Sequence, residues 1–520
     1  MTLFMKPKSF MLTFLIAITC ELNGQTLRTA LPDTFDIKNS DPAISDTGPT
    51  SQFFTLIYSP LIYIDDYTGK LRSRLTKRFY WNGNDLIFDI KPNIKTRTGE
   101  VIDADTVIKS FKRSFIVAPE NATPLVQELC PGGLKSINDP CKNIRIKNNS
   151  VIFAFERKTP LIITRFASDK FSIIPKKAYD SKTLKITDFA NTTGHFYINS
   201  STKNGDRYIL KRNFHLPYKK GTAKTIEVLS YNSSLEYEKQ KTLVRNGQID
   251  LLPYNNELTR KDIQNLSNEV KGTSLVVSDE LTSLAIKFTN RGLALPQKQK
   301  FQVAAALRTR IAQFRKKLSK EKGTYGRAIN QLIPVGIFGH LPPPKEKEVV
   351  DFWTKQNSAW PDDLILEVSM GASTVESFRK LLAPLNDHLL YKIDEAGLAH
   401  PSFAGREPND FRTPHLAIVA FGSSAYETLS SATAKVINAE YFYVRGEEAK
   451  SWVQEYAATD DASQRLEKYR KLHFESLTSK VSVIPMASKP FISLVGPKLN
   501  PSQIPKGVQI LPLWDLEIKK

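Results

Sequence analysis

The stretch from Leu56 to Phe115 constrains what this chain can fold into more than any other part of its sequence. It opens with an apolar run that ends at Ile64, and a polar turn follows at residues 65–69, where Gly69 can adopt a positive φ. Apolar side chains at alternate positions of Leu86–Ile90 predict a half-buried strand. The stretch therefore predicts short strands joined by tight turns.

A helix is predicted to follow the second turn, Thr98-Gly99, and to begin after Asp103. An aspartate at that position can cap a helix by accepting hydrogen bonds from its first free N–H groups. Beyond it, apolar residues recur at helical spacing while basic residues lie on other faces. The apolar residues are Val107, Ile108, Phe111 and Phe115, and the basic ones are Lys109, Lys112 and Arg113.

This order of parts resembles the start of the extracellular solute-binding proteins of family 5. These form the peptide/nickel class, which includes the oligopeptide- and dipeptide-binding receptors of ABC importers. Residues 58–61, YSPL, match the family's YEPL phrase, and residues 68–71 with Leu75 match its DG-x-L-x-P-x-LA phrase. Thr98-Gly99 and residues 103–107 match its DG-x-x-x-T-A-E-D-V phrase. The ordered set carries the resemblance, and the alternative is an ordinary β-hairpin followed by a helix.

The resemblance implies an α/β fold of the two-lobed periplasmic-binding-protein type, class II and large, with an extra N-terminal subdomain and a ligand cleft between the lobes. Such a protein binds a peptide-like small solute by hinge closure and delivers it to the permease of an ABC importer. It needs no cofactor and is not an enzyme. The implied divisions are a signal peptide at 1–24, a lobe I core from 25–55, 172–282 and 487–520, the extra N-terminal subdomain at 56–171, and lobe II at 283–486.

Further matches lie along the rest of the chain. Residues 171–176 resemble the family's I-x-P-K exit from the subdomain, and residues 192–196 resemble its GTGPY phrase, with His195 in place of the proline. A single histidine beside a glycine turn is usually structural, and a ligand or pH-switch role is the alternative. Residues 284–290 resemble the crossover into the second lobe, and residues 481–486 resemble the return across the hinge.

Hydrophobic periodicity predicts the other elements. Strands are expected at 151–155, 364–368, 389–393 and 416–420, and helices at 302–312, 373–385 and 463–477. Residues 244–251 resemble the family's G-E-I-D element, which implies that a helix ends at Gly247 and a strand follows. Pro342-Pro343-Pro344 and the charged KEKE run after them predict a stiff exposed loop.

The candidate ligand site is the loop that follows residues 416–420. Peptide-binding relatives read W-G-A-D-Y-P-D-P there, and their aspartate holds the peptide's ammonium by a charge-assisted bond. In this chain Ser424 takes its place, which puts recognition of a free peptide N-terminus in doubt; a shifted alignment would use Glu427 instead. The expected ligand-binding residues are Phe421, Gly422, Ser423, Ser424 and Tyr426, joined by Thr34 and Phe35 of an N-terminal loop and by Arg406, for which a surface position is the alternative.

The N-terminus has the pattern of an export signal. Lys6 and Lys8 precede an apolar run at 10–19, and Gly24 is a suitable last residue before cleavage. This predicts a periplasmic protein. Cys20 allows a lipid-anchored alternative, although the residues before it fit that signal poorly, and a buried N-terminal helix is a further alternative.

Two cysteines, Cys130 and Cys141, remain if the first 24 residues are removed. An even pair in an exported protein indicates a disulfide, and the Pro-Gly-Gly and Asn-Asp-Pro segments between them can turn the chain. Two free buried thiols are the alternative. Neither cysteine belongs to a CxxC or metal-ligand pattern, so no metal site is expected.

The formal net charge of +20 favours anionic surroundings such as a membrane or cell-wall surface. Its densest basic run is residues 308–322, where Ile311 and Phe314 should face the core of a helix. No nucleic-acid-binding module accompanies this charge, and an exported address argues against such a partner. We expect a monomer.

No catalytic motif occurs in the chain: HExxH, GxSxG, GxGxxG and a Walker loop are all absent. A Ser-His-Asp set assembled only in space remains open. Two alternatives to a transport receptor stay open as well. One is a sensor or cell-wall-peptide scavenger on the same scaffold, and the other is a secreted basic hydrolase that acts on anionic polymers.

Overall fold

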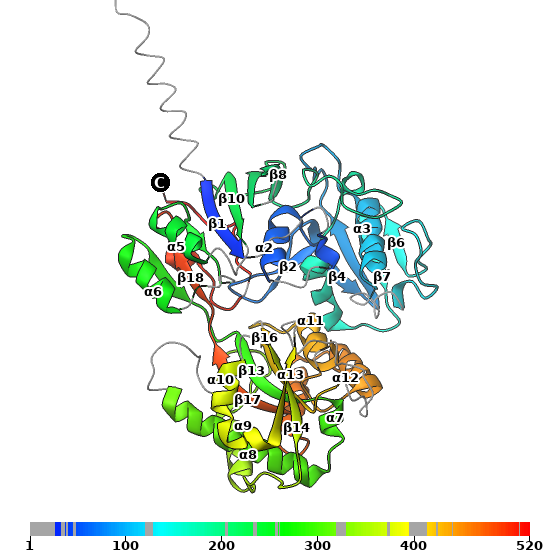
Figure 1. Ribbon diagram of the computed structural model, residues 1–520. Coiled ribbons are helices and arrows are strands. Elements are labelled where there is room, and N and C mark those ends of the chain that lie inside the picture. Colours follow the sequence, from blue (N-terminus) through cyan, green and yellow to red (C-terminus); the bar gives the residue numbers. More distant parts are fainter. Residues whose placement is uncertain are drawn as a thin grey trace, which may run out of the picture.

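The chain forms an upper and a lower lobe, as the computed structural model in Figure 1 shows. The upper lobe contains a seven-stranded sheet and an attached four-stranded sheet, and the lower lobe contains a five-stranded sheet, as counted over the described residues. The structure describes residues 26–32, 37, 40–44, 48–119, 128–202, 206–231, 237–254, 258, 260–318, 329–371, 375–394, 413–422, 425–438, 440–508 and 510–519.

The seven-stranded sheet is mixed and is covered on both faces. Successive strand residues point to opposite faces, so Leu251 packs with α2 while Leu252 packs with α5 and α6. Burial on both sides explains why Leu27, Ala30 and Leu31 of β1 are all buried, although Leu27 and Leu31 point to one face and Ala30 to the other. In sheet order the strands are β12 (Ser274–Val277), β18 (Ile492–Val495), β11 (Leu251–Leu252), β1 (Thr26–Pro32), β10 (Thr225–Tyr231), β9 (Arg207–Arg212) and β8 (Phe196–Ser201). The helices of this lobe are η2 (Pro42–Ile44), α2 (Gly48–Ile57), η5 (Lys176–Ala178), α5 (Tyr237–Arg245), α6 (Arg260–Glu269) and η10 (Pro501–Gln503).

The four-stranded sheet and the helix packed on it, α3 (Ala104–Val117), are called the N-terminal subdomain below. Asp103 caps α3 as predicted, because its carboxylate accepts hydrogen bonds from the N–H and hydroxyl of Thr106 at 2.8 and 2.7 Å. Phe111 of α3 packs against Phe153 of the sheet. The sheet consists of β4 (Thr76–Asn82), β5 (Asp85–Ile90), β7 (Ser150–Ala154) and β6 (Ile144–Lys147) in that order, with the hairpin β2 (Ile62–Ile64) and β3 (Leu71–Ser73) and the short helices η3 (Pro160–Ala167) and η4 (Asp169–Phe171) beside it.

Arg113 of α3 is buried between the helix and the rest of the upper lobe. Its side chain is completely buried, it donates to the carbonyl of Leu184 at 2.9 Å, and it forms a salt bridge with Asp41. A buried guanidinium costs free energy unless it is paired, and here it is paired twice. This arginine therefore ties the N-terminal subdomain to the rest of the upper lobe.

Cys130 and Cys141 form the predicted disulfide, and both residues are buried. The bridge closes a segment of sequence separation 11 beside the four-stranded sheet. Within the segment, Asp139 accepts hydrogen bonds from the N–H groups of Lys135 and Ser136 at 2.7 and 2.8 Å.

The lower lobe is built on a sheet in the order β15, β14, β16, β13 and β17, with helices packed around it (Figure 1). Its strands are β13 (Thr282–Phe288), β14 (Leu366–Gly371), β15 (Leu389–Asp394), β16 (Leu416–Gly422) and β17 (Val483–Lys489). Its helices are α7 (Asn290–Leu293), α8 (Gln297–Leu318), α9 (Pro343–Thr354), α10 (Val375–Leu381), η7 (Ala383–His388), α11 (Leu429–Thr433), η9 (Ala434–Asn438), α12 (Gly446–Ala458) and α13 (Ala462–Leu477). Each predicted strand and helix here has its counterpart, although α10 ends earlier than expected. Ile311 of α8 is buried, as its spacing predicted.

The predicted loop after Pro342 is wrong, because α9 begins at Pro343. Proline is favoured in the first turn of a helix, where its missing N–H has no partner to lose. Val349 and Trp353 then fall four residues apart on the face that packs into the core. The KEKE run is therefore the exposed side of a helix.

The chain crosses between the lobes twice, and the two crossing segments are paired. Strands β12 and β18 are antiparallel neighbours in the upper sheet, and β13 and β17 are antiparallel neighbours in the lower one. Between the sheets, Ser278 donates its N–H to the carbonyl of Phe491 at 2.9 Å, and the N–H of Phe491 donates to the Ser278 hydroxyl at 2.8 Å. We call these paired segments the crossing ribbon. The domain boundaries expected from the sequence stay a prediction.

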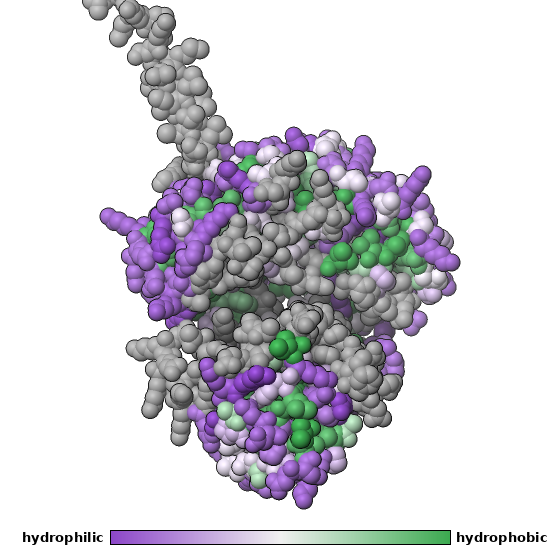
Figure 2. Space-filling view, viewed as in Figure 1, coloured by the Kyte–Doolittle hydropathy of each residue, from purple (hydrophilic) through white to green (hydrophobic). Residues whose placement is uncertain are grey.

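The described surface on the face in Figure 2 is mostly hydrophilic, with apolar patches over the N-terminal subdomain and on the lower lobe. Within the described ranges, no helix is both long and apolar enough to cross a bilayer. The predicted signal segment at 1–24 lies outside the described residues, as do residues 319–322 of the basic run.

Replacing both Cys130 and Cys141 with serine is expected to lower the free energy of unfolding by about 2–3 kcal/mol, because the bridge restricts the unfolded chain. Denaturant titration of the variant and of the oxidised wild type measures the difference. Wild type in reductant serves as the control and should match the variant. Equal midpoints for all three samples would contradict a stabilising bridge.

Candidate functional site

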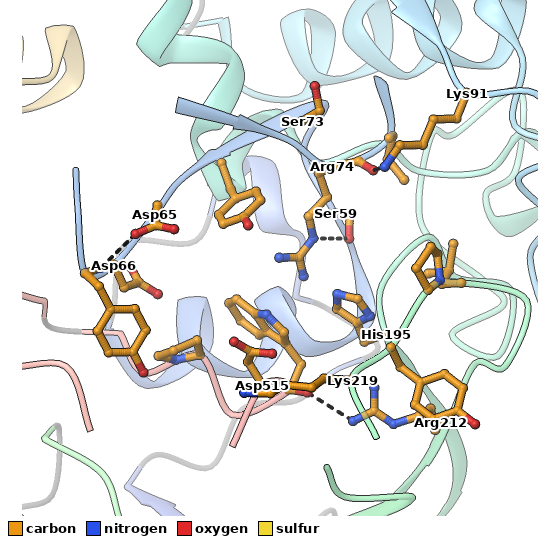
Figure 3. Close-up of a pocket in the computed structure, with 18 residues that line it drawn as sticks. Ser59, Asp65, Asp66, Ser73, Arg74, Lys91, His195, Arg212, Lys219 and Asp515 are labelled. Carbon is orange, nitrogen blue, oxygen red and sulfur yellow. Dashed lines mark hydrogen bonds between the residues drawn. The ribbon is translucent and has the colours of Figure 1, made fainter. Parts of the chain in front are cut away.

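A cavity of about 460 Å³ opens in the upper lobe between the β2–β3 hairpin, the chain after β9 and the C-terminal segment (Figure 3). The residues that line it all belong to the upper lobe. They are Ser59, Tyr63, Asp65, Asp66, Tyr67, Ser73, Arg74, Leu75, Lys91, His195, Arg212, Leu216, Pro217, Tyr218, Lys219, Pro512, Trp514 and Asp515.

Arg74, the residue directly after β3, extends its side chain into the middle of this cavity (Figure 3). Its guanidinium lies over the ring of Trp514, 4.4 Å from the centroid, and 5.4 Å from that of Tyr63. Its Nε donates to the Ser59 hydroxyl at 3.2 Å, but it forms no salt bridge with any residue that the structure describes. Burial lowers the pKa of Arg74 to about 10, so the side chain stays charged at neutral pH.

Two carboxylates flank Arg74, Asp66 from the hairpin and Asp515 from the C-terminal segment (Figure 3). Neither carboxylate accepts a hydrogen bond from a described residue. Burial raises the pKa of Asp66 to about 7, although Arg74 opposes the rise. Burial also raises the pKa of Asp515. The cavity thus holds one unpaired cation between two carboxyl groups that lack partners.

The opposite wall carries His195 and three more cations. The imidazole stacks on Trp514 with 6.1 Å between centroids, and its buried Nδ1 has no hydrogen-bond partner. Burial and the nearby Arg74, Arg212 and Lys91 hold the pKa of His195 well below its usual value, so it is neutral. The other cations have protein partners. Arg212 donates to two carbonyls, Lys91 donates to the Arg74 carbonyl, and Lys219 pairs with Glu517.

The turn at residues 65–70 forms one rim of the cavity and is well ordered by its own bonds. Asp65 accepts hydrogen bonds from the N–H and hydroxyl of Thr68 at 2.8 and 2.7 Å, and Gly69 has the positive φ, 68°, that the sequence predicted. On its outer side the turn contacts the lower lobe. Tyr426 donates its hydroxyl to the Asp66 carbonyl at 2.9 Å, and its ring covers Gly69 so closely that a Cβ there would lie 2.2 Å from Cδ1.

The structure describes only part of the site that the sequence predicted. Gly422 ends β16, and Tyr426 lies at the junction of the lobes next to the cavity rim. Phe421 is described in its backbone alone, and Thr34, Phe35, Arg406, Ser423 and Ser424 lie outside the described residues.

Glu427 cannot take over the role of the missing aspartate. Its carboxylate receives two hydrogen bonds from Arg465, at 2.8 and 2.9 Å, and one from Tyr456 at 2.5 Å. These bonds hold α12 and α13 of the lower lobe to the loop after β16, so the group already has its partners. These partners argue against the shifted alignment considered above.

Sequence reasoning missed the cavity because its walls come from segments far apart in the chain. Asp65, Asp66 and Gly69 were recognised as a turn, and His195 was interpreted as structural. The sequence did carry one signal, because Arg74 directly follows the short hairpin of β2 and β3. Nothing in the sequence indicated that Trp514 would cover its guanidinium. Among the described residues no cluster of histidine, cysteine or carboxylate side chains could hold a metal ion.

Comparisons with known proteins identify the fold. No family model matches the sequence, and no curated protein matches it. Solved structures match closely in shape over 95% of this chain. The ABC transporter-associated periplasmic binding protein DppA from Helicobacter pylori, in complex with the peptide STSA, is 14% identical with a TM-score of 0.68 and is covered to 98%.

Two further structures agree. The dipeptide binding protein from Pseudoalteromonas sp. SM9913, in complex with Met-Leu, is 13% identical with a TM-score of 0.69, and 95% of this chain and all of that chain are covered. The Escherichia coli murein tripeptide binding protein MppA is 14% identical with a TM-score of 0.66, with 95% of this chain and 99% of that chain covered. The predicted two-lobed periplasmic-binding-protein fold is confirmed.

Asp66→Asn is expected to raise the melting temperature by about 2–4 °C near pH 8 and to change it little near pH 4. The folded protein binds a proton at Asp66 up to about pH 7, whereas the unfolded chain releases it near its ordinary value of 3.8. The contribution of Asp66 to the free energy of unfolding therefore falls as pH rises between those values. Arg74 opposes the rise in the pKa of Asp66, and the nearby Asp65 and Asp515 add to it. Thermal denaturation at several pH values measures the effect.

Asp180→Asn is the matched control with the opposite sign. Hydrogen bonds from Thr183 lower the pKa of Asp180, so this variant should lose stability at the higher pH. If the melting temperatures of Asp66→Asn and wild type differ by the same amount at every pH, Asp66 does not bind a proton in the folded protein.

Proposed function

We propose that this protein is an exported receptor that binds a peptide-like solute between its lobes by hinge closure and delivers it to the permease of an ABC importer. The observation that carries the proposal is the match of the fold over 95% of the chain to binding proteins, two of them in complex with short peptides. All three structures compared above are binding proteins, which supports a receptor over a hydrolase.

The crossing ribbon supports hinge closure. Two lobes whose chain connections run through such a ribbon can rotate relative to each other about a few residues, while both sheets stay intact. Closure would bury a ligand and create a surface that a permease can distinguish from the open form. The function is binding and release, and we propose no catalytic step.

Contacts away from the ribbon support closure of the lobes onto each other. Thr164 of η3 accepts the N–H of Leu429 from α11 at 2.9 Å, and Arg165 donates to the Thr433 hydroxyl at 3.1 Å. With Tyr426 on the 65–70 turn, these bonds join the N-terminal subdomain and the hairpin to the lower lobe. A largely exposed salt bridge between Lys158 and Asp460, 3.6 Å long, lies at the same junction.

The ligand is proposed to lie against the loop after β16. Phe421, Gly422, Ser423, Ser424 and Tyr426 would face it from the lower lobe, with Arg406, and Thr34 and Phe35 from the upper. A serine at position 424 accepts a hydrogen bond but does not neutralise an ammonium, so we expect weak dependence on a free peptide N-terminus. Export through residues 1–24, or a lipid anchor at Cys20, would place a monomer in the periplasm, where its positive charge favours anionic surfaces.

Equilibrium dialysis of the purified protein against a mixture of tri- to hexapeptides tests the function. A receptor should retain a subset of peptides unchanged in mass, in stoichiometric amount. Cleavage products would support the hydrolase alternative, and retention no greater than for a denatured sample would refute the receptor.

Gly69→Ala is expected to loosen the junction of the lobes, because the new methyl group would occupy the place of the Tyr426 ring. Gly83→Ala is the matched control, since Gly83 also has a positive φ, 59°, but nothing lies within 4 Å of an added Cβ. Small-angle X-ray scattering should give a larger radius of gyration for Gly69→Ala than for the control. Equal radii would mean that Tyr426 does not hold the lobes together.

A further inference from the structure

We propose that the cavity around Arg74 is a second binding site, which takes a small zwitterion by its carboxylate and ammonium groups: a free amino acid or the end of a short peptide. This goes beyond the proposed function, because the cavity belongs to one lobe and its ligand need not be held by closure. Arg74 would hold the carboxylate, and Asp66 and Asp515 would hold the ammonium.

Arg74 is the group in the cavity whose bonding is incomplete. Trp514 and Tyr63 contact its guanidinium, and Ser59 takes one of its five N–H donors. Both Nη atoms lack a hydrogen-bond partner among the described residues, and no carboxylate pairs with them. A planar, oriented fork of donors of this kind matches a carboxylate in two parallel bonds.

The neighbouring cations do not compete for the same role. Arg212 uses Nε and Nη2 on the carbonyls of Ala223 and Trp514, at 2.6 and 3.0 Å. Lys91 donates to the Arg74 carbonyl at 2.8 Å, and Lys219 pairs with Glu517 at 2.6 Å. A ligand carboxylate would therefore be directed to Arg74.

The two carboxyl groups select a zwitterion over a simple anion. Asp515, and Asp66 in its ionised form, would repel an anion that brought no positive charge, whereas an ammonium group offers three donors to their free oxygens. His195 is neutral and stacks on Trp514, so it adds no charge that would compete with the ligand's ammonium. The charges of ligand and site then compensate each other.

The size and the walls of the cavity fit the same ligand class. Its volume of about 460 Å³ lies in the range of small-molecule sites in proteins, about 300–1,000 Å³. Leu75, Leu216, Pro217 and Pro512 supply apolar surface between the charged groups. A short side chain could lie on that surface while the charged groups bind at either side.

Isothermal titration calorimetry with L-alanine, L-alanyl-L-alanine, its C-terminal amide and its N-acetyl derivative tests the proposal. L-Alanine or L-alanyl-L-alanine, the two probes that carry both a free carboxylate and a free amine, should bind saturably. For at least one of them the Kd should lie below about 10 mM, within the range of weak specific sites. The amide should bind about tenfold or more weakly, because it loses a charge-assisted bond. The comparison of alanine with dialanine distinguishes an amino acid from a peptide end.

Arg74→Met keeps the side chain between the two rings but removes its donors. This variant should weaken binding of the free acid by about tenfold or more, and it should bind the acid and the amide equally well. Arg78→Met, on the exposed side of β4, makes the same change in net charge and should behave as wild type. If Arg74→Met does not fold, Arg74→Lys should show an intermediate loss, because lysine cannot make the bidentate contact.

Three results would overturn the proposal: no saturable binding of either free probe to wild type, equal binding of acid and amide, or a preference that survives in Arg74→Met or Arg74→Lys. Repeating the peptide retention test with Arg74→Met separates the two proposals: retention that survives in the variant supports the site between the lobes, and retention that is lost belongs to this cavity. Loss of peptide retention with intact alanine binding would refute the receptor and leave this site standing.

Discussion

The pairing of the two crossing segments is the constraint on which the rest of the structure depends. Because β12–β18 and β13–β17 are hydrogen-bonded ladders at the two ends of one ribbon, the lobes cannot separate without breaking backbone bonds that would be costly to leave unmade. Rotation is left to the few residues between the ladders, around Ser278 and Phe491. The contacts of the N-terminal subdomain with α11 follow from this restriction.

The 65–70 turn lies between the two proposed binding sites. Asp65 and Gly69 hold its shape, Asp66 faces the cavity on one side, and Tyr426 rests against it on the other. A turn held by its own side chain changes little in shape, so a ligand pressing on Asp66 would act on the same unit that Tyr426 contacts. The junction of the lobes and the cavity are thus neighbours that share one rigid element.

Local physical rules predicted a large part of the fold. Asp103 as a cap, the strand at residues 86–90 and the glycine at 247 each depend on the residues next to them, and each was confirmed. The predicted half-buried alternation was not, because Ile87 is buried together with Leu86 and Phe88. Pro342 was misinterpreted because a proline run has two local outcomes, and only the burial of Val349 and Trp353 selects the helix. The site was predicted less well, because Arg74, His195 and Trp514 come from three distant segments.

The sequence by itself determined many of the helices and strands, though not α9, together with the disulfide partners and the two-lobed fold, since these follow from periodicity, capping and recognisable phrases along the chain. Only the tertiary structure decided which charges are satisfied. It paired Glu427 with Arg465, buried Arg113 against Asp41 and left Arg74 between two rings without a carboxylate. The physical reason is that a salt bridge depends on distance in space, and a one-dimensional pattern carries no information about which far-apart residues will meet.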